Sequence, residues 1–265
     1  DNLPIIAIPT IAATGSDMDS DAMLCNEETN DKMSLNIPPQ FPAYSLLDPT
    51  YTCTVPRRQT AAGTADIMSH IMEVYFSKTP GAFFPDRIME AMLKTCVKYG
   101  TIACCEDPSN YEARANLLWT ASWGCNGFFD CGKIGRRWSV HPMEHQLGAY
   151  YDETHGIGIA ILTIQWMRYV LNDDTKDMFA TFGTNVLGIA PEGDTMLTAK
   201  RAIDALEELF HKWGIPKNLR ESGIGITDKS KFEIMAEKAL GPAGRINGFV
   251  PLDKQDVINI YDAAF

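Results

Sequence analysis

The chain has 265 residues, of which 45% are hydrophobic and 22% are charged, as in an ordinary folded globular protein. This composition excludes a disordered chain, a collagen-like chain and a coiled-coil rod. Its 23 Lys and Arg against 34 Asp and Glu give a formal net charge of −11. That balance argues against nucleic-acid binding, which needs clustered positive charge.

The seven cysteines are odd in number, and no two of them form a CxxC motif. We therefore expect neither a disulfide framework nor a thiolate zinc site, and we interpret the cysteines as reduced thiols. No apolar run approaches the roughly 20 residues of a bilayer-spanning helix, and no signal segment opens the chain. These features predict a cytoplasmic location. Because the chain opens on Asp1 and runs straight into an apolar stretch, we expect a fragment that starts inside a domain.

Residues 1–55 carry short apolar runs separated by prolines. The run from Pro4 to Pro9 predicts a buried strand. Further strands are predicted at Ala22–Cys25, Met33–Ile37 and Tyr44–Leu47. This pattern is typical of the edge of an α/β or mixed sheet domain.

From residue 56 onward the hydrophobic pattern is helical. In residues 194–213 apolar side chains recur in steps of three and four, which is one face of a helix, and Gly214 follows as a stop signal. Residues 84–104 show the same pattern. Further helices are predicted near residues 58–77, 109–128, 138–149, 155–171, 228–240 and 254–264. The sequence therefore predicts a mostly α protein, with a sheet remnant over residues 1–55 and an all-helical domain over residues 56–265.

Four of the five histidines lie in two short segments. In the first segment, Asp66 and His70 are four residues apart, which places them on one side of a helix. Taken alone, such a pair is most simply a surface contact. The flanking residues Ile67, Met68 and Ile71 are apolar, however, so we expect a buried helix whose Asp and His need partners.

The second segment holds three histidines within fifteen residues. Pro142 suits the first turn of a helix, so His141 is predicted at its start and His145 one turn later. His155 precedes an apolar run and is predicted to begin the next helix. Capping or core histidines are the simpler alternative. Imidazoles with one carboxylate suit Zn²⁺ or Fe²⁺ rather than Ca²⁺ or Mg²⁺, so we predict a metal site, although spacing does not choose between His141 and His145.

Two other interpretations compete with this one. His141 to His145 spells H-x-x-E-H, a metallopeptidase pattern in which both histidines bind zinc and Glu144 is the general base. That short pattern arises easily by chance and leaves Asp66, His70 and His155 without a role. The remaining alternative is a non-catalytic metal-binding fragment.

Three blocks make the chain similar to the iron-containing (group III) alcohol dehydrogenases, most closely their butanol-dehydrogenase-like branch. Residues 6–19 (IAIPTIAATGSDMD) resemble the PTTAGTGSE loop of that family. Residues 60–76 resemble its D-x-x-x-H helix, and residues 140–167 resemble its H-x₁₃-H block. The third block is long and specific, and the similarity continues through nearly the whole chain.

The resemblance implies a metal-dependent oxidoreductase that interconverts primary alcohols and aldehydes. Hydride would pass to or from NAD(H) or NADP(H) through a metal-bound alkoxide. The family's metal ligands fall on Asp66, His70, His141 and His155, which would hold Fe²⁺ or alternatively Zn²⁺. His145 falls on a histidine that members place beside the nicotinamide, and it is the candidate for relaying the proton.

The resemblance also implies cofactor contacts at Thr10, Ser16, Asp21 and Lys32. Asp21 stands where members often carry Asn. No Gly-rich phosphate loop precedes Thr10, so residues 1–55 are interpreted as the C-terminal remnant of a Rossmann-like cofactor-binding domain. Residues 56–265 would be the helical metal-binding catalytic domain. A small alcohol or aldehyde substrate and a homodimer are implied as well.

Overall fold

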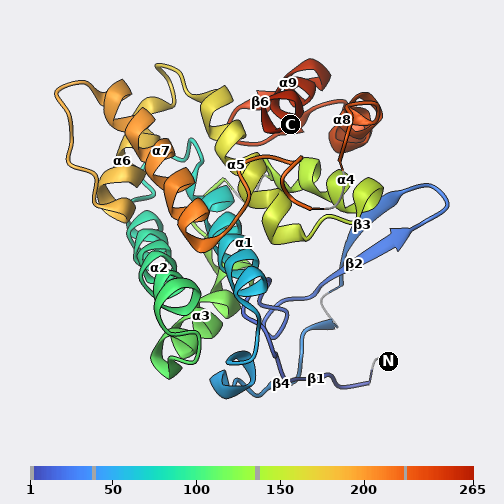
Figure 1. Ribbon diagram of the computed structural model, residues 1–265, viewed down its shortest axis with the longest axis vertical. Coiled ribbons are helices and arrows are strands. Elements are labelled where there is room, and N and C mark those ends of the chain that lie inside the picture. Colours follow the sequence, from blue (N-terminus) through green and yellow to red (C-terminus); the bar gives the residue numbers. More distant parts are fainter. Residues whose placement is uncertain (1–2, 38–39, 135–137, 224–225) are drawn as a thin grey trace.

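The computed structural model describes residues 3–37, 40–134, 138–223 and 226–265, and this part of the chain is mostly helical (Figure 1). The α-helices are α1 (Arg57–Tyr75), α2 (Phe83–Thr101), α3 (Tyr111–Gly124), α4 (His141–Tyr151), α5 (His155–Val170), α6 (Lys176–Leu187), α7 (Thr195–Trp213), α8 (Phe232–Leu240) and α9 (Lys254–Ala264). The strands are β1 (Ile6–Ala7), β2 (Asp21–Asn26), β3 (Asp31–Asn36), β4 (Tyr44–Ser45), β5 (Ile246–Asn247) and β6 (Pro251–Leu252). The prediction of a mostly α protein that opens with a small amount of sheet is confirmed.

Helix α1 lies at the centre of the helical part and packs against α5, α2 and α3 (Figure 1). Every residue of α1 from Thr60 to Tyr75 is buried. Small residues allow this close packing: a Cβ at Gly156 in α5 would lie 2.0 Å from the carbonyl oxygen of Ala62 in α1. Because α1 is enclosed, its polar side chains must find polar partners inside the protein.

The residues at the two ends of α7 explain why this helix begins and ends close to its predicted boundaries. Asp194 accepts a hydrogen bond from the backbone N–H of Met196 and so caps the start of α7. Gly214 follows its last residue with a φ of 99°, a left-handed conformation that favours glycine. Trp213, fully buried just before this stop, donates a hydrogen bond from Nε1 to Oγ1 of Thr101 in α2.

The prediction of helices missed α6. Its apolar residues Phe179, Phe182 and Val186 are buried at helical spacing, and it packs chiefly on α7. The segment is only 12 residues long and contains Thr181, Gly183 and Thr184, which are weak helix formers. Packing against α7 therefore outweighs local preference here.

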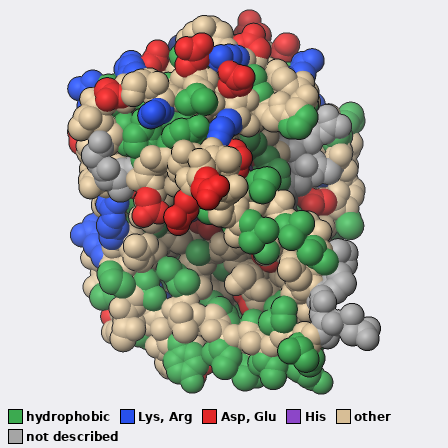
Figure 2. All heavy atoms as spheres, turned by 90° about the vertical axis from the view of Figure 1, so that its right-hand side faces the viewer, with side chains coloured by type: hydrophobic (Ala, Val, Ile, Leu, Met, Phe, Trp, Pro, Cys, Tyr) green, Lys and Arg blue, Asp and Glu red, His purple; other side chains and the backbone are tan. Residues whose placement is uncertain are grey.

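The N-terminal strands match their predicted positions, but the predicted burial of residues 4–9 is wrong. β1 pairs in parallel with β4, and Ile6 is 62% exposed. The hydrophobic core of the described residues contains none of residues 4–9, and the side chains of these residues are exposed or half-buried. Hydrophobic side chains gather accordingly on the lower part of the face shown in Figure 2.

Strands β2 and β3 form an antiparallel hairpin that projects beside α4 and α8 (Figure 1). The register pairs Asp21 with Asn36 and Cys25 with Lys32, so these side chains lie on one face. Lys238 of α8 holds the hairpin turn, because its Nζ donates to the carbonyl oxygen of Asn30 and to a carboxylate oxygen of Asp31. In the described part of the chain, no helix combines the length and hydropathy needed to cross a lipid bilayer.

Candidate metal centre

A cavity of about 830 Å³ lies between the β2–β3 hairpin and the first turns of α4 and α5. The hairpin contributes one wall of mixed polarity, which includes Asp21, Met23 and Lys32. The opposite wall carries histidines from three helices. These histidines are His70, His141, His145 and His155.

Four side chains that could hold a metal ion lie close together beside this cavity. Asp66 and His70 come from one face of α1, as their spacing predicted, while His141 and His155 are the first residues of α4 and α5. One donor atom from each lies within 4.8 Å of the other three. Nε2 of His155 is 3.3 Å from Oδ1 of Asp66, and the His70 and His141 rings stack with their centroids 4.8 Å apart.

His145 lies beside this cluster rather than in it. Its ring centroid is 6.0 Å from that of His141 and 5.9 Å from that of His155. The geometry thus groups His141, not His145, with Asp66, a choice that the spacing had left open. Burial, together with the neighbouring imidazoles, lowers the pKa of His145 to about 2, so its ring is neutral at pH 7.

Glu73, one turn after His70 on α1, binds the start of α4. Its carboxylate accepts backbone N–H bonds from Ser139, Val140 and His141. Its Oε1 also lies 2.6 Å from Nδ1 of His141. Val140 gives α4 no side-chain cap of its own, so Glu73 supplies that cap from another helix. Burial raises the pKa of Glu73 to about 7, although the three backbone N–H groups act in the opposite direction.

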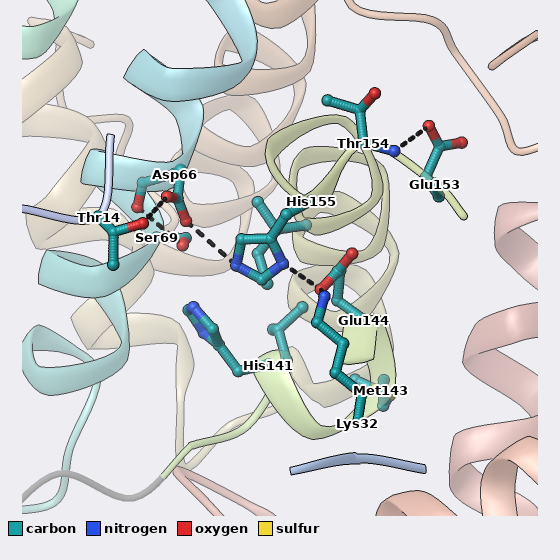
Figure 3. A network of polar contacts seen from close by, with 12 residues as sticks. Thr14, Lys32, Asp66, Ser69, His141, Met143, Glu144, Glu153, Thr154 and His155 are labelled. Atoms are coloured by element: carbon teal, nitrogen blue, oxygen red, sulfur yellow. Dashed lines mark hydrogen bonds and ion pairs between the residues drawn. The ribbon is translucent and has the colours of Figure 1, made fainter. Parts of the chain in front are cut away.

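Glu144 on α4 contacts Nδ1 of His155, as Glu73 contacts Nδ1 of His141. Its side chain is fully buried, and Oε2 hydrogen-bonds Nδ1 of His155 (Figure 3). Nζ of Lys32, on the hairpin, lies 3.8 Å from the same oxygen. The carboxylate that the H-x-x-E-H pattern assigns as a general base therefore contacts an imidazole.

At the cluster, burial and neighbouring charges shift the pKa values of Asp66 and His155 in opposite directions. Burial alone would raise the pKa of Asp66, but the imidazoles of His70, His155 and His141 hold it well below its usual range. Burial alone would lower the pKa of His155, but Glu144 and Asp66 raise it to about 10. Thr14, from the loop after β1, reaches Oδ2 of Asp66 at 3.5 Å (Figure 3).

The predicted cofactor contacts fall into two groups. Asp21 and Lys32 line the cavity, and Asp21 accepts a hydrogen bond from Asn36 at 2.7 Å. Thr10 and Ser16 are exposed and are not among the residues that line this cavity. Cofactor binding by these four residues stays a prediction.

Reasoning from the sequence missed Glu73 and Trp138. Glu73 was detectable, because it follows His70 by three residues on a helix predicted to be buried, where a carboxylate needs donors. Trp138 packs its ring against His141, with centroids 4.2 Å apart, and against His70 at 5.9 Å. It lies outside every helix and strand, so no periodicity points to it.

The family model of the C-terminal part of the Fe-containing alcohol dehydrogenases matches residues 60–265, and a second model, iron-containing alcohol dehydrogenase, matches residues 1–49. The chain belongs to the iron-containing alcohol dehydrogenase family. The family resemblance seen in the sequence is confirmed, and the donor set described above lies within the part matched by the first model.

Relatives of this chain include NADH-dependent butanol dehydrogenase A of Clostridium acetobutylicum, 51% identical over 99% of this chain and 67% of the relative. An NADPH-dependent aldehyde reductase of Escherichia coli is 31% identical over 84% of this chain and 56% of the relative. The crystal structure of NADH-dependent butanol dehydrogenase A from Thermotoga maritima superimposes with a TM-score of 0.89 at 32% identity, covering 100% of this chain and 66% of that one. The chain thus spans about two thirds of the length of butanol dehydrogenases that it matches.

Proposed function

We propose that this chain forms the metal centre of an NAD(P)-dependent dehydrogenase that interconverts primary alcohols and aldehydes. The observation that carries the proposal is the convergence of Asp66, His70, His141 and His155, from three helices, on one point beside a cavity. Relatives named as butanol dehydrogenases and aldehyde reductases support the substrate class, and their names support both NADH and NADPH as partners.

The donor set fits a divalent transition metal. One carboxylate and three imidazoles suit Fe²⁺ or Zn²⁺, and together they leave one net positive charge on the site. Glu73 and Glu144 engage Nδ1 of His141 and His155, which makes Nε2 the atom that each ring can offer. Asp66, His70, His141 and His155 would hold the cation, which, when bound, supplies a Lewis acid that lowers the pKa of the substrate hydroxyl.

The other residues at the cavity orient the reactants and move the proton. His145 lines the cavity beside the four donors, so its ring would relay the proton of the hydroxyl. Trp138 covers the cluster on one side and limits the access of water to His70 and His141. Asp21 and Lys32, on the hairpin wall of the cavity, would hold a nicotinamide cofactor, whose chemistry when bound is to accept or donate the hydride.

The organisation of the whole protein belongs to the same proposal. Residues 1–55 would complete a cofactor-binding domain, residues 56–265 would form the catalytic domain, and two copies would form a homodimer. Light scattering of the purified full-length protein measures the number of copies. A monomer at micromolar concentration would contradict the dimer without affecting the metal centre.

The proposed function is tested by activity and metal content together. Full-length protein loaded with Fe²⁺ or Zn²⁺ is expected to reduce NAD⁺ or NADP⁺ in the presence of a primary alcohol such as butanol, and a chelator is expected to abolish the reaction. Returning the metal should restore it. Stoichiometric metal with no turnover of any primary alcohol or aldehyde would leave only a metal-binding protein, and undiminished turnover after complete metal removal would overturn the proposed centre.

A further inference from the structure

We propose that Glu73 and Glu144 are positioning residues that fix the orientation and the tautomer of His141 and His155, so that both rings present Nε2 to the same cation. This inference rests on the proposed function, because it concerns the same four donors. It adds a role for two carboxylates that would not themselves contact the metal, the substrate or the cofactor.

Glu73 is held too firmly to rotate away from His141. Three backbone N–H groups, those of Ser139, Val140 and His141, donate to its carboxylate, and Oε1 stands 2.6 Å from Nδ1 of His141. The three backbone N–H donors favour the ionised form of this buried carboxylate, which only accepts hydrogen bonds, so the ring donates to it from Nδ1. The lone pair is then on Nε2, the atom suited to a metal.

Glu144 has a comparable setting on the other side of the cluster. It is fully buried, and Oε2 accepts from Nδ1 of His155 while Nε2 of that ring lies 3.3 Å from Oδ1 of Asp66. Nζ of Lys32 forms an ion pair with the same carboxylate oxygen, Oε2, at 3.8 Å. Gly158 leaves room for this side chain, since a Cβ there would lie 3.2 Å from Cγ of Glu144.

Gly148 leaves room for the side chain of Lys32. A Cβ at Gly148 would lie 2.8 Å from Nζ of Lys32, so a larger residue at that position would displace the ammonium group. The hairpin, α4 and α5 are thus shaped around one chain of contacts from Lys32 through Glu144 to His155 (Figure 3). Two ligands from two different helices are therefore oriented by the same chemical device, a buried carboxylate on Nδ1.

A carboxylate in this position makes its histidine a stronger ligand and removes the freedom of the ring to flip. Loss of such a partner typically lowers metal affinity by about 10-fold to 100-fold. The effect is expected in the metal-binding equilibrium itself and does not depend on catalytic turnover. Glutamine is the appropriate replacement because it keeps the shape of the side chain but offers an N–H₂ group that can pair with an unprotonated Nδ1.

The experiment measures Zn²⁺ affinity of the full-length protein by competition with a chromophoric chelator. Glu73→Gln and Glu144→Gln are expected to bind Zn²⁺ about 10-fold to 100-fold more weakly than the parent protein. Glu90→Gln is the matched control, because its carboxylate is also buried but bonds to the side chains of Tyr75 and Asn185. This control is expected to bind as the parent does.

Imidazole nitrogen NMR of the Zn²⁺-loaded proteins provides a readout that a merely structural role would not change. The parent protein is expected to show Nε2 ligation and a proton on Nδ1 for both His141 and His155. Glu73→Gln should alter the ring signals of His141 alone, and Glu144→Gln those of His155 alone. Melting temperatures identify any variant that fails to fold, and Glu144→Gln decides the matter if Glu73→Gln does fail.

The outcomes separate the two proposals. If the parent protein does not bind Zn²⁺ or Fe²⁺, the metal centre is overturned and the positioning role with it. If the parent binds tightly and the folded Gln variants keep both its affinity and its ring signals, the positioning role alone is overturned. Weaker binding together with a change confined to the partner histidine supports it.

Discussion

His155 and Asp66 face each other across the contact between α5 and α1, with Nε2 of the imidazole 3.3 Å from Oδ1 of the carboxylate. This pair joins the two sequence segments that carry the histidines. Asp66 also has Oδ1 3.7 Å from Nε2 of His70, so it stands between two of the proposed ligands. It is the sole carboxylate among the four donors and so brings the only negative charge to the group.

Replacing Asp66 by Ala is expected to remove the bound metal and nearly all alcohol-dependent reduction of NAD(P)⁺. Lewis-acid assistance of several kcal/mol corresponds to a loss of roughly a thousandfold or more in kcat. Elemental analysis and the absorbance of NAD(P)H measure the two effects. Asp228→Ala is the control, since that carboxylate is exposed and bonds to the backbone of Ser230. Full turnover by metal-free Asp66→Ala would contradict the prediction.

The stability of the metal-free protein is expected to fall as pH rises from about 6.5 to about 10. His155 has its pKa raised from 6.5 to about 10, since burial, which lowers it, is outweighed by Glu144 and Asp66. The folded state therefore holds this proton more tightly than the unfolded state, and the stabilisation is complete below about pH 6.5 and lost as pH passes 10. Urea unfolding with a chelator present measures it.

The control for this pH dependence is His155→Gln, which has no titrating ring at the position. Its free energy of unfolding should depend less steeply on pH over the same interval. Equal slopes in the two proteins would show that His155 is not the group responsible. With metal present the direction reverses for binding: affinity should rise with pH, because the cation must displace the proton from His155.

Gly156→Ala tests the contact between α1 and α5. The added methyl group would lie 2.0 Å from the carbonyl oxygen of Ala62, so the helices must separate. We expect a loss of about 1–3 kcal/mol in the free energy of unfolding and weaker metal binding, because His155 is the adjacent residue. Gly193→Ala is the control, since its added Cβ would meet no atom within 4 Å. Similar stability for both variants would contradict this account of the packing.

Ser122→Ala is expected to loosen residues 10–20 from α3. Oγ of Ser122 donates to Oδ2 of the buried Asp17 at 2.5 Å. Losing this donor inside the protein costs about 1–3 kcal/mol in the free energy of unfolding. A double-mutant cycle with Asp17→Ala isolates the pair, and Ser230→Ala, at an exposed position, is the comparison. Additive effects of the two substitutions would show that they do not interact.

Spacing along the chain predicted part of the cluster that we propose as a metal centre. Asp66 and His70 share a helix face because they are four residues apart, and Pro142 marked the start of α4, so both observations depend on local geometry alone. The choice between His141 and His145 depends on where α4 lies relative to α1. Spacing along the chain carries no information about this tertiary arrangement, so it could not decide between the two histidines.

The features that the sequence did not predict also depend on how distant segments pack together. The run from Pro4 to Pro9 has the composition of a buried strand, but exposure depends on what packs against it, and composition carries no information about that. Glu144 was noticed for its place in H-x-x-E-H, yet its contact with Nδ1 of His155 depends on the turn between α4 and α5. The role of Glu73 likewise depends on α4 beginning beside α1.

The absence of a side chain at Gly156 has a consequence for the mechanical behaviour of the centre. Where α5 meets Ala62, main chain touches main chain, so the separation of the two helices is set by stiff covalent units and not by side chains that can change rotamer. Asp66 lies one turn beyond that crossing on α1, and His155 immediately precedes it on α5. The backbone contact between α1 and α5 therefore fixes the separation of these two side chains, independently of the position of the hairpin wall.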